Sequence, residues 1–314
     1  MNLDPQLKIF ISVDVVGSTA YKNRPGADQS WLPFFRDFYS QFPILLGKSY
    51  SSEEIKETLE SAGEMDQLTL WKALGDELIF QATLTNYKQA LIHILAFRAA
   101  TEDYLKNIRR GKDSQGDKEG LGLKCAAWLA GFPVCNAFIF SSIAGEVEDY
   151  IGPSIDVGFR LSKFATQRKF IVSVDLALML VHDTSSLEFY FDGEEELKGA
   201  LNGKRYPIIW IRVNADQETL VDALQNKGHA KIDALKSYCR DYIKGTGWPL
   251  ITPFIDGDQI FKNRPEQYDE KYDEVIQYYE EHQYEQGENV DQSGDQISDK
   301  EKNEFIEYVT SSPE

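Results

Sequence analysis

The 314-residue sequence is poor in the residues that build disulfide frameworks and zinc centres. Its four histidines, at positions 93, 182, 229 and 282, are scattered without zinc-ligand spacing. Cys125, Cys135 and Cys239 show no paired or CxxC spacing, and an odd count does not suit a disulfide framework. We expect these cysteines to be small buried apolar side chains.

Long apolar runs are also lacking. No stretch approaches the roughly 18 consecutive apolar residues of a membrane helix. The N-terminal segment MNLDPQLKIF has neither a basic head nor the apolar core of a signal peptide. The sequence therefore predicts a cytoplasmic protein without a membrane partner, and its 42% hydrophobic content is ample for one large domain or two smaller ones.

Positive charge is scarce, since 33 Lys and Arg residues face 51 Asp and Glu residues and leave a formal net charge of −18. Such a chain repels nucleic acids and anionic lipid surfaces, which argues against a DNA-binding role. It can still bind a small anion where a few cations are focused at one site. A divalent metal ion would supply much of the missing positive charge there.

The pattern of apolar residues predicts an α+β protein. A strand, a helix, a hairpin, a helix and a strand follow one another at residues 7–16, 30–48, 68–83, 86–110 and 123–134. This order is that of the ferredoxin-like βαββαβ plan, in which helices cover one face of an antiparallel sheet.

The character of the sequence changes after its middle. Further helical and strand patterns continue to a hairpin at residues 189–213, and a helical pattern covers residues 218–245. Acidic residues and tyrosines dominate from residue 264 onward. We expect one domain at residues 1–215 and, at residues 216–314, a helical extension with an acidic, partly disordered tail.

Two acidic residues occupy matching places in this plan. Asp14 lies at the end of the first strand, and Asp76 lies in the turn of the hairpin. Because the first strand and the hairpin are neighbours in a ferredoxin-like sheet, the two carboxylates can meet at one edge beside the carbonyl of Val15. Such oxygen ligands suit Mg²⁺ or Mn²⁺. An ordinary Gly-Asp turn and a surface acid at a strand end would explain each residue separately.

The loop that follows Asp14 is suited to anions. Gly17, Ser18 and Thr19 precede the next helix, and their backbone N–H groups could bind phosphates.

Four segments in this order resemble the catalytic domain of class III nucleotide cyclases: FISVDVVGST, WKALGDELIF, YIGPSIDVGFRLSKFA and ELKGALNGK. The resemblance covers roughly residues 7–213. The segments GLKCAAWLAGFPV and DYIGPSIDVGFRLSKFATQ further resemble the bacterial pyrimidine cyclases of the Pycsar antiphage systems. The resemblance implies a class III cyclase fold with a C-terminal helical extension and a head-to-tail homodimer with active sites at the subunit interface.

The resemblance also assigns roles to individual residues. Asp14 and Asp76, with the carbonyl of Val15, would hold two Mg²⁺ or Mn²⁺ ions in one protomer. From the second protomer, Lys72 and Asp149 would contact the base.

Three further residues of the second protomer would act on the sugar and phosphates. Asp156 falls where the family has an asparagine that orients the ribose, Arg160 falls on the arginine facing the transferring phosphate, and Lys198 falls on the triphosphate lysine. An ionised aspartate cannot donate a hydrogen bond as asparagine does, so the ribose contact of Asp156 is in question.

The implied reaction converts UTP to 3′,5′-cyclic UMP and pyrophosphate, and the product would act on a separate effector in antiphage defence. CTP and ATP are alternative substrates, because the pair Lys72 and Asp149 reads adenine in adenylyl cyclases. A pyrimidine leaves space that a bulky side chain would fill, and Tyr150 and Tyr50 are candidates for this role.

Two rival functions remain open. A diguanylate cyclase has a second glycine where Leu74 stands and phenylalanine where Leu78 stands, so its signature is incomplete here. A degenerate cyclase domain could also bind nucleotides without turnover, although Asp14, Asp76 and Arg160 are all present.

Overall fold

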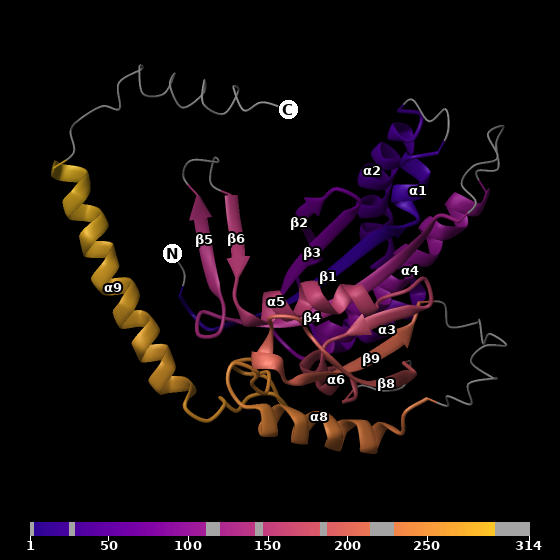
Figure 1. The fold of residues 1–314 in the computed structure, drawn as a ribbon. Helices are drawn as coiled ribbons and strands as arrows, with labels where there is room; N and C mark the ends of the chain where they lie inside the picture. The colour runs from indigo at the N-terminus through magenta and orange to yellow at the C-terminus, as the bar shows by residue number, and fades with distance from the viewer. Residues whose placement is uncertain are drawn as a thin grey trace. The chain divides into compact units, whose positions relative to one another are not determined.

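A computed structural model describes residues 3–24, 29–110, 120–141, 147–182, 187–213 and 229–292 (Figure 1). The chain forms two compact units, Met1–Glu266 and Gln267–Glu314. The boundary expected between residues 215 and 216 lies outside the described residues, as does the expected tail beyond residue 292.

The first four strands of the large sheet have the predicted plan. Their order is β2-β3-β1-β4, and every neighbouring pair is antiparallel. One helical segment joins β1 to β2, and a second joins β3 to β4, which is the βαββαβ connection. The elements are β1 (Gln6–Val16), α1 (Ser18–Lys22), α2 (Leu32–Ser49), α3 (Glu53–Ala62), β2 (Thr69–Leu74), β3 (Glu77–Leu84), α4 (Lys88–Arg110) and β4 (Gly122–Phe132).

Three more strands extend this sheet to seven. β7 pairs with β4 in parallel, and the antiparallel pairs β7–β9 and β9–β8 complete the order β2-β3-β1-β4-β7-β9-β8. β5 and β6 form a separate two-stranded sheet. The remaining elements of the first unit are β5 (Ala137–Ser141), β6 (Val147–Ile151), α5 (Pro153–Leu161), η1 (Ser162–Phe164), β7 (Lys169–Val172), α6 (Val174–Leu180), β8 (Phe189–Glu196), η2 (Leu201–Gly203), β9 (Arg205–Arg212) and α8 (Ile232–Thr246).

Alternation along β1 divides the interior into two clusters. Ile9, Ile11 and Val13 belong to the main core, which also contains the phenylalanines of α2 and the apolar face of α4. Phe10 points to the other face of the sheet and packs in a second cluster with Trp128 and with side chains from β6 and α5. Because successive strand residues face opposite sides, Asp14 lies on the same face as Phe10.

α8 belongs to the first compact unit. Its buried residues Leu235, Cys239 and Ile243 recur at helical spacing and join the main core. The second unit contains α9 (Tyr268–Gln292), whose first turn is acidic. None of the described helices is long and apolar enough to span a bilayer.

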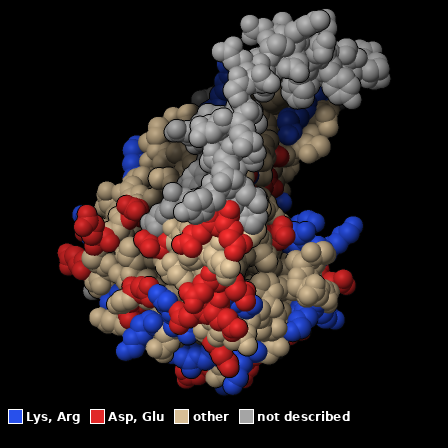
Figure 2. Space-filling view, turned by 90° about the vertical axis from the view of Figure 1, so that its left-hand side faces the viewer, with Lys and Arg blue, Asp and Glu red and all other residues tan. Residues whose placement is uncertain are grey.

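The surface reflects the excess of acidic residues. Figure 2 shows groups of Asp and Glu side chains on the surface, with Lys and Arg side chains among them. Because positive charge is scarce in the sequence, lysines and arginines that lie together create local sites that attract small anions.

Gly158 lets α5 lie close to β4. A Cβ atom at this position would come within 2.1 Å of Cδ2 of Trp128, and Trp128 is 1% exposed. No larger residue fits without moving the indole ring, since packed interiors do not yield easily.

We expect Gly158→Ala to lower the free energy of unfolding by about 1–3 kcal/mol, because the added methyl group overpacks the contact with Trp128. Urea denaturation followed by circular dichroism measures this. Gly245→Ala in α8 is the matched control, because a Cβ there meets nothing within 4 Å and alanine favours a helix. Equal free energies of unfolding for the two variants would contradict the close contact.

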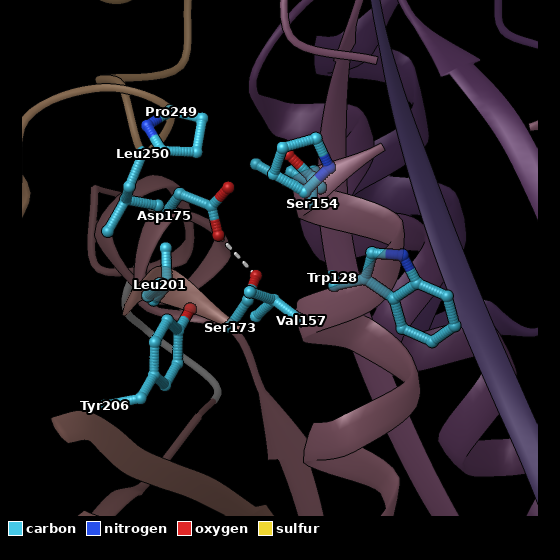
Figure 3. Close-up of a pocket in the computed structure, with 11 residues that line it drawn as sticks. Trp128, Ser154, Val157, Ser173, Asp175, Leu201, Tyr206, Pro249 and Leu250 are labelled. Carbon is cyan, nitrogen blue, oxygen red and sulfur yellow. Dashed lines mark hydrogen bonds between the residues drawn. The ribbon is translucent and has the colours of Figure 1, made fainter. Parts of the chain in front are cut away.

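A small cavity of about 10 Å³ lies beside α6, enough for roughly one water molecule. Figure 3 shows the Asp175 carboxylate on its wall, with the hydroxyl of Ser173 donating to it. The N–H of Leu176 donates to the same oxygen at 2.9 Å. Burial nevertheless raises the pKa of Asp175 from 3.8 to about 6.

This shift makes stability dependent on pH. The folded state binds the Asp175 proton more tightly than the unfolded state. This difference adds to the free energy of unfolding; the added stability is fully present below pH 3.8 and is lost as the pH rises to about 6. Asp175→Asn removes this titration. Its free energy of unfolding relative to the parent should rise by about 2 kcal/mol between pH 4 and pH 7. Thermal melts across this range test it, with the exposed Asp241→Asn as control; a difference that stays flat with pH would refute the account.

Candidate functional site

The structure brings Asp14 and Asp76 to one edge of the sheet. β1 and β3 pair in a register that sets Asp14 opposite Glu77. The N–H of Val15 donates to the carbonyl of Asp76 at 3.2 Å, which fixes the hairpin turn against the end of β1. Gly75 has the positive φ of 66° that this tight turn requires.

Two lysines accompany the two carboxylates. Nζ of Lys124 lies 2.8 Å from Oδ2 of Asp14, and Nζ of Lys22 lies 3.9 Å from Oδ2 of Asp76. Each of these four side chains is between 23% and 33% exposed, so the group is open to a ligand from solvent. The two ammonium groups partly neutralise the negative charge of the two carboxylates.

Glu77 is a third carboxylate of this group, and our sequence analysis missed it. Burial raises the pKa of Glu77; a hydrogen bond with Ser12 opposes this, and the carboxylates of Asp14 and Asp76 add to it. The pairing register of β1 with β3 reveals the position of Glu77, because it sets Glu77 directly opposite Asp14 near the end of β1.

The residues present fit a hard divalent cation bound with few protein ligands. Among the described residues, no group of three or more His, Cys, Asp or Glu side chains is arranged to hold a metal ion. Asp14 and Asp76 would therefore share the ion with the Val15 carbonyl and with oxygens of a ligand. Mg²⁺ is commonly held in this way, by one or two carboxylates and substrate phosphates.

The loop after β1 is shaped by Gly17. Its φ is 81°, and a Cβ atom would come within 2.8 Å of the carbonyl oxygen of Gly120. The hydroxyl of Ser18 donates to Oδ2 of Asp76, so Ser18 positions this aspartate. Thr19 is exposed beside it at the start of the five-residue helix α1.

A second group forms around Arg160 at the end of α5. Its Nε donates to the carbonyl of Lys198 at 2.5 Å, and its Nη1 donates to the carbonyl of Asp156 at 2.9 Å. Oδ1 of Asp156 lies 3.4 Å from the same nitrogen. Lys198, 38 residues along the chain from Arg160, is therefore a neighbour of Asp156 and Arg160, and the Arg160 side chain is 27% exposed.

Lys72 and Asp149 also lie together. Nζ of Lys72 on β2 is 2.6 Å from Oδ2 of Asp149 on β6, and each side chain is about one-third exposed. The ammonium also lies over the ring of Trp71, 4.7 Å from its centroid. This ion pair links the separate β5–β6 hairpin to the edge strand of the large sheet.

The structure does not bring the two tyrosines to an open site. Tyr50 is 4% exposed, and its hydroxyl lies 2.7 Å from Nδ1 of His93 in the main core. Tyr150 is 3% exposed and packs edge-on against Phe10 and Trp71. Both are buried core side chains, and neither lines an open site in the described part of the chain.

Lys124, which pairs with Asp14, is expected to weaken the binding of a cation there. Because an ammonium group repels a divalent cation, Lys124→Gln should raise the affinity for Mn²⁺ about fivefold, corresponding to a surface pair of about 1 kcal/mol. The electron paramagnetic resonance signal of free Mn²⁺ measures this affinity. Lys106→Gln removes the lysine of an exposed pair with Asp103 and serves as control. An affinity that Lys124→Gln leaves unchanged or weakens would place the cation elsewhere.

No family model and no curated protein matches the chain. Among solved structures, the chain is similar to the adenylyl cyclase CyaB from P. aeruginosa, with 14% identity, a TM-score of 0.47, and coverage of 70% of this chain and 100% of that one. A bacterial light-regulated adenylyl cyclase has 12% identity and a TM-score of 0.45, with coverage of 77% and 58%. The guanylate cyclase domain of RhGC from Catenaria anguillulae, in complex with GTP, has 10% identity and a TM-score of 0.41, with coverage of 66% and 96%. The function of this chain is therefore inferred from its own residues.

Proposed function

We propose that the protein is a metal-dependent nucleotide cyclase that converts a nucleoside triphosphate to its 3′,5′-cyclic monophosphate and pyrophosphate. In this reaction the ribose 3′-oxygen loses its proton and bonds to the α-phosphorus, while the bond from that phosphorus to the leaving pyrophosphate breaks. The observation that carries the proposal is the meeting of Asp14 and Asp76, fixed by the hydrogen bond from Val15 to Asp76.

Asp14, Asp76 and the Val15 carbonyl would hold Mg²⁺ or Mn²⁺, two ions per site. When bound, such ions lower the pKa of the attacking hydroxyl and neutralise phosphate charge. Ser18 holds Asp76 in place through its hydroxyl. The exposed backbone around Gly17 and Thr19 lies beside this group and is proposed to bind a phosphate.

Arg160 is proposed to stabilise charge on the transferring phosphate. Its Nε and Nη1 are held by the carbonyls of Lys198 and Asp156, which leaves Nη2 to face a ligand. The exposed ammonium of Lys198 would bind the leaving phosphates. Asp156 accepts from Arg160 through its carbonyl, so we infer that it positions the arginine and does not orient the ribose.

A head-to-tail homodimer would unite the two groups. Among the described residues of one chain, no hydrogen bond or ion pair joins Asp14 or Asp76 to Arg160. A second copy that places its Arg160 against the carboxylates of the first would complete the site, and the reverse contact would complete the other site.

Lys72 and Asp149 are proposed to read the base. Together they present one donor and one acceptor, which complement any base edge with an acceptor beside a donor. Uracil, cytosine and adenine all have such an edge. We favour UTP, because residues 122–134 and 149–167 resemble pyrimidine cyclases, with CTP and ATP as alternatives. The cyclic product would then act on a separate effector in antiphage defence.

The proposal is tested by incubating the protein with each of the four nucleoside triphosphates and Mn²⁺, followed by chromatography. We expect cyclic UMP and pyrophosphate as the main products. Asp76→Asn should lower the rate at least about 10²–10³-fold, because it removes a charge that the transition state requires. Asp241→Asn, an exposed change of the same kind in α8, is the control.

Several outcomes would contradict the proposal. Nucleotide binding without turnover would indicate a sensor, and a product made from two GTP molecules would indicate a diguanylate cyclase. Full activity of Asp76→Asn would remove Asp76 from the site.

A further inference from the structure

A large open cavity lies between α1, α2 and the β2–β3 turn, and the proposed reaction does not use it. Its volume is about 580 Å³, within the range of small-molecule sites. The lining residues are Lys22, Trp31, Leu32, Phe35, Arg36, Tyr39, Ser40 and Gly75. Those from α2 recur at helical spacing and form one stripe of that helix.

The cavity is not the cleft of the carboxylates. Asp14 lies on the same sheet face as Phe10, whereas Phe35 and its neighbours on α2 belong to the core on the opposite face. The two sites adjoin at the hairpin turn, where Gly75 lines the cavity and Asp76 follows it, and at Lys22, which lines the cavity and lies 3.9 Å from Asp76.

Aromatic side chains form the apolar wall of the cavity, and contacts with neighbouring residues hold them in place. The rings of Trp31 and Phe35 pack edge-on with centroids 5.8 Å apart. Phe35 is 8% exposed, and the hydroxyl of Tyr39 donates to the carbonyl of Gly75. A planar apolar body would therefore meet aromatic rings without reordering them.

Two cations lie on the same cavity. Nζ of Lys22 lies over the Phe35 ring, 5.2 Å from its centroid, and 3.9 Å from Oδ2 of Asp76. Arg36 is exposed, and among the described residues it makes no hydrogen bond or ion pair. In a protein of net charge −18, two neighbouring cations on an apolar cavity attract a small anion.

From these features we propose that the cavity is a regulatory site for a small aromatic anion, such as a carboxylate or sulfonate attached to a planar ring. The ring packs on Trp31 and Phe35, and the anionic group pairs with Arg36 and Lys22. No covalent step is involved.

Occupancy of the cavity is coupled to Asp76. Two lining residues connect the cavity to that carboxylate: Tyr39 donates to the carbonyl of Gly75, the neighbour of Asp76, and Nζ of Lys22 lies 3.9 Å from Oδ2 of Asp76. An anion that pairs with Lys22 cancels the positive charge beside Asp76. The affinity of the carboxylates for Mn²⁺ should then rise about fivefold, the low end for coupled sites. This coupling rests on the proposed function, whereas the binding site does not.

Binding is tested with 8-anilinonaphthalene-1-sulfonate, a small aromatic anion that fluoresces when bound. Arg36→Gln should weaken its binding about tenfold, the loss expected for one charge-assisted hydrogen bond. Arg240→Gln in α8 makes the same charge change at another exposed position and should leave binding as in the parent. The uncharged analogue N-phenyl-1-naphthylamine should bind equally to the parent and to Arg36→Gln.

A cavity-filling variant separates the site from general surface binding. Leu32→Trp should weaken both dyes, provided that its thermal melt matches that of the parent. Equal binding of the sulfonate dye to the parent, Arg36→Gln and Leu32→Trp would overturn the site, as would no binding to the parent.

The coupling has its own readout. Mn²⁺ affinity measured with and without saturating dye should differ about fivefold in the parent and not in Lys22→Gln. Equal affinities in the parent would overturn the coupling. Dye binding that depends on Arg36 in a protein that cyclises no nucleotide would refute the proposed function and leave this site standing.

Discussion

The antiparallel pairing of β1 with β3 is the constraint on which the rest of the site depends. Its register sets Asp14 opposite Glu77, and one further hydrogen bond, from the N–H of Val15 to the carbonyl of Asp76, places the hairpin turn beside the end of β1. Asp14 and Asp76, which are far apart in the sequence, therefore lie at the same edge of the sheet. A slip of one residue would turn Asp14 into the main core, where an unpaired carboxylate is very costly.

The same pairing explains why charged side chains surround this edge. Three carboxylates lie together in a partly buried place, and burial, together with repulsion by Asp14 and Asp76, raises the pKa of Glu77. Lys124 and Lys22 relieve part of this repulsion. A divalent cation would relieve it more completely, which is the electrostatic reason to place one here.

Local patterns in the sequence were enough to predict the βαββαβ core. The run at residues 7–16 is rich in β-branched residues, and the hairpin has a Gly-Asp turn, so both elements follow from short-range chemistry. The β5–β6 hairpin was missed, because a two-stranded sheet depends on packing of Phe138 and Tyr150 against the second cluster and not on its own pattern. The burial of Tyr50 left no local pattern in the sequence, because its partner, His93, lies far along the chain.

Some residues of the candidate site were likewise predictable from local patterns, whereas others required the tertiary structure. The proximity of Asp14 and Asp76 was predictable, because Asp14 lies near the end of a strand, Asp76 lies in the hairpin turn, and the strand order follows from the plan. Glu77 required the register, and the support of Arg160 by the carbonyl of Lys198 required the tertiary fold. Side chains whose role depends on a neighbour 38 residues away leave no periodic signal in the sequence.

A double-mutant cycle on Mn²⁺ affinity tests the central claim, that Asp14 and Asp76 bind the same cation. The affinity would be measured for the parent, for Asp14→Asn, for Asp76→Asn and for the double variant. If the two carboxylates share the ion, each single change should weaken binding strongly, and the double variant should be little worse than either. Losses that simply add, or single changes without effect, would show that the two carboxylates do not act on one ion.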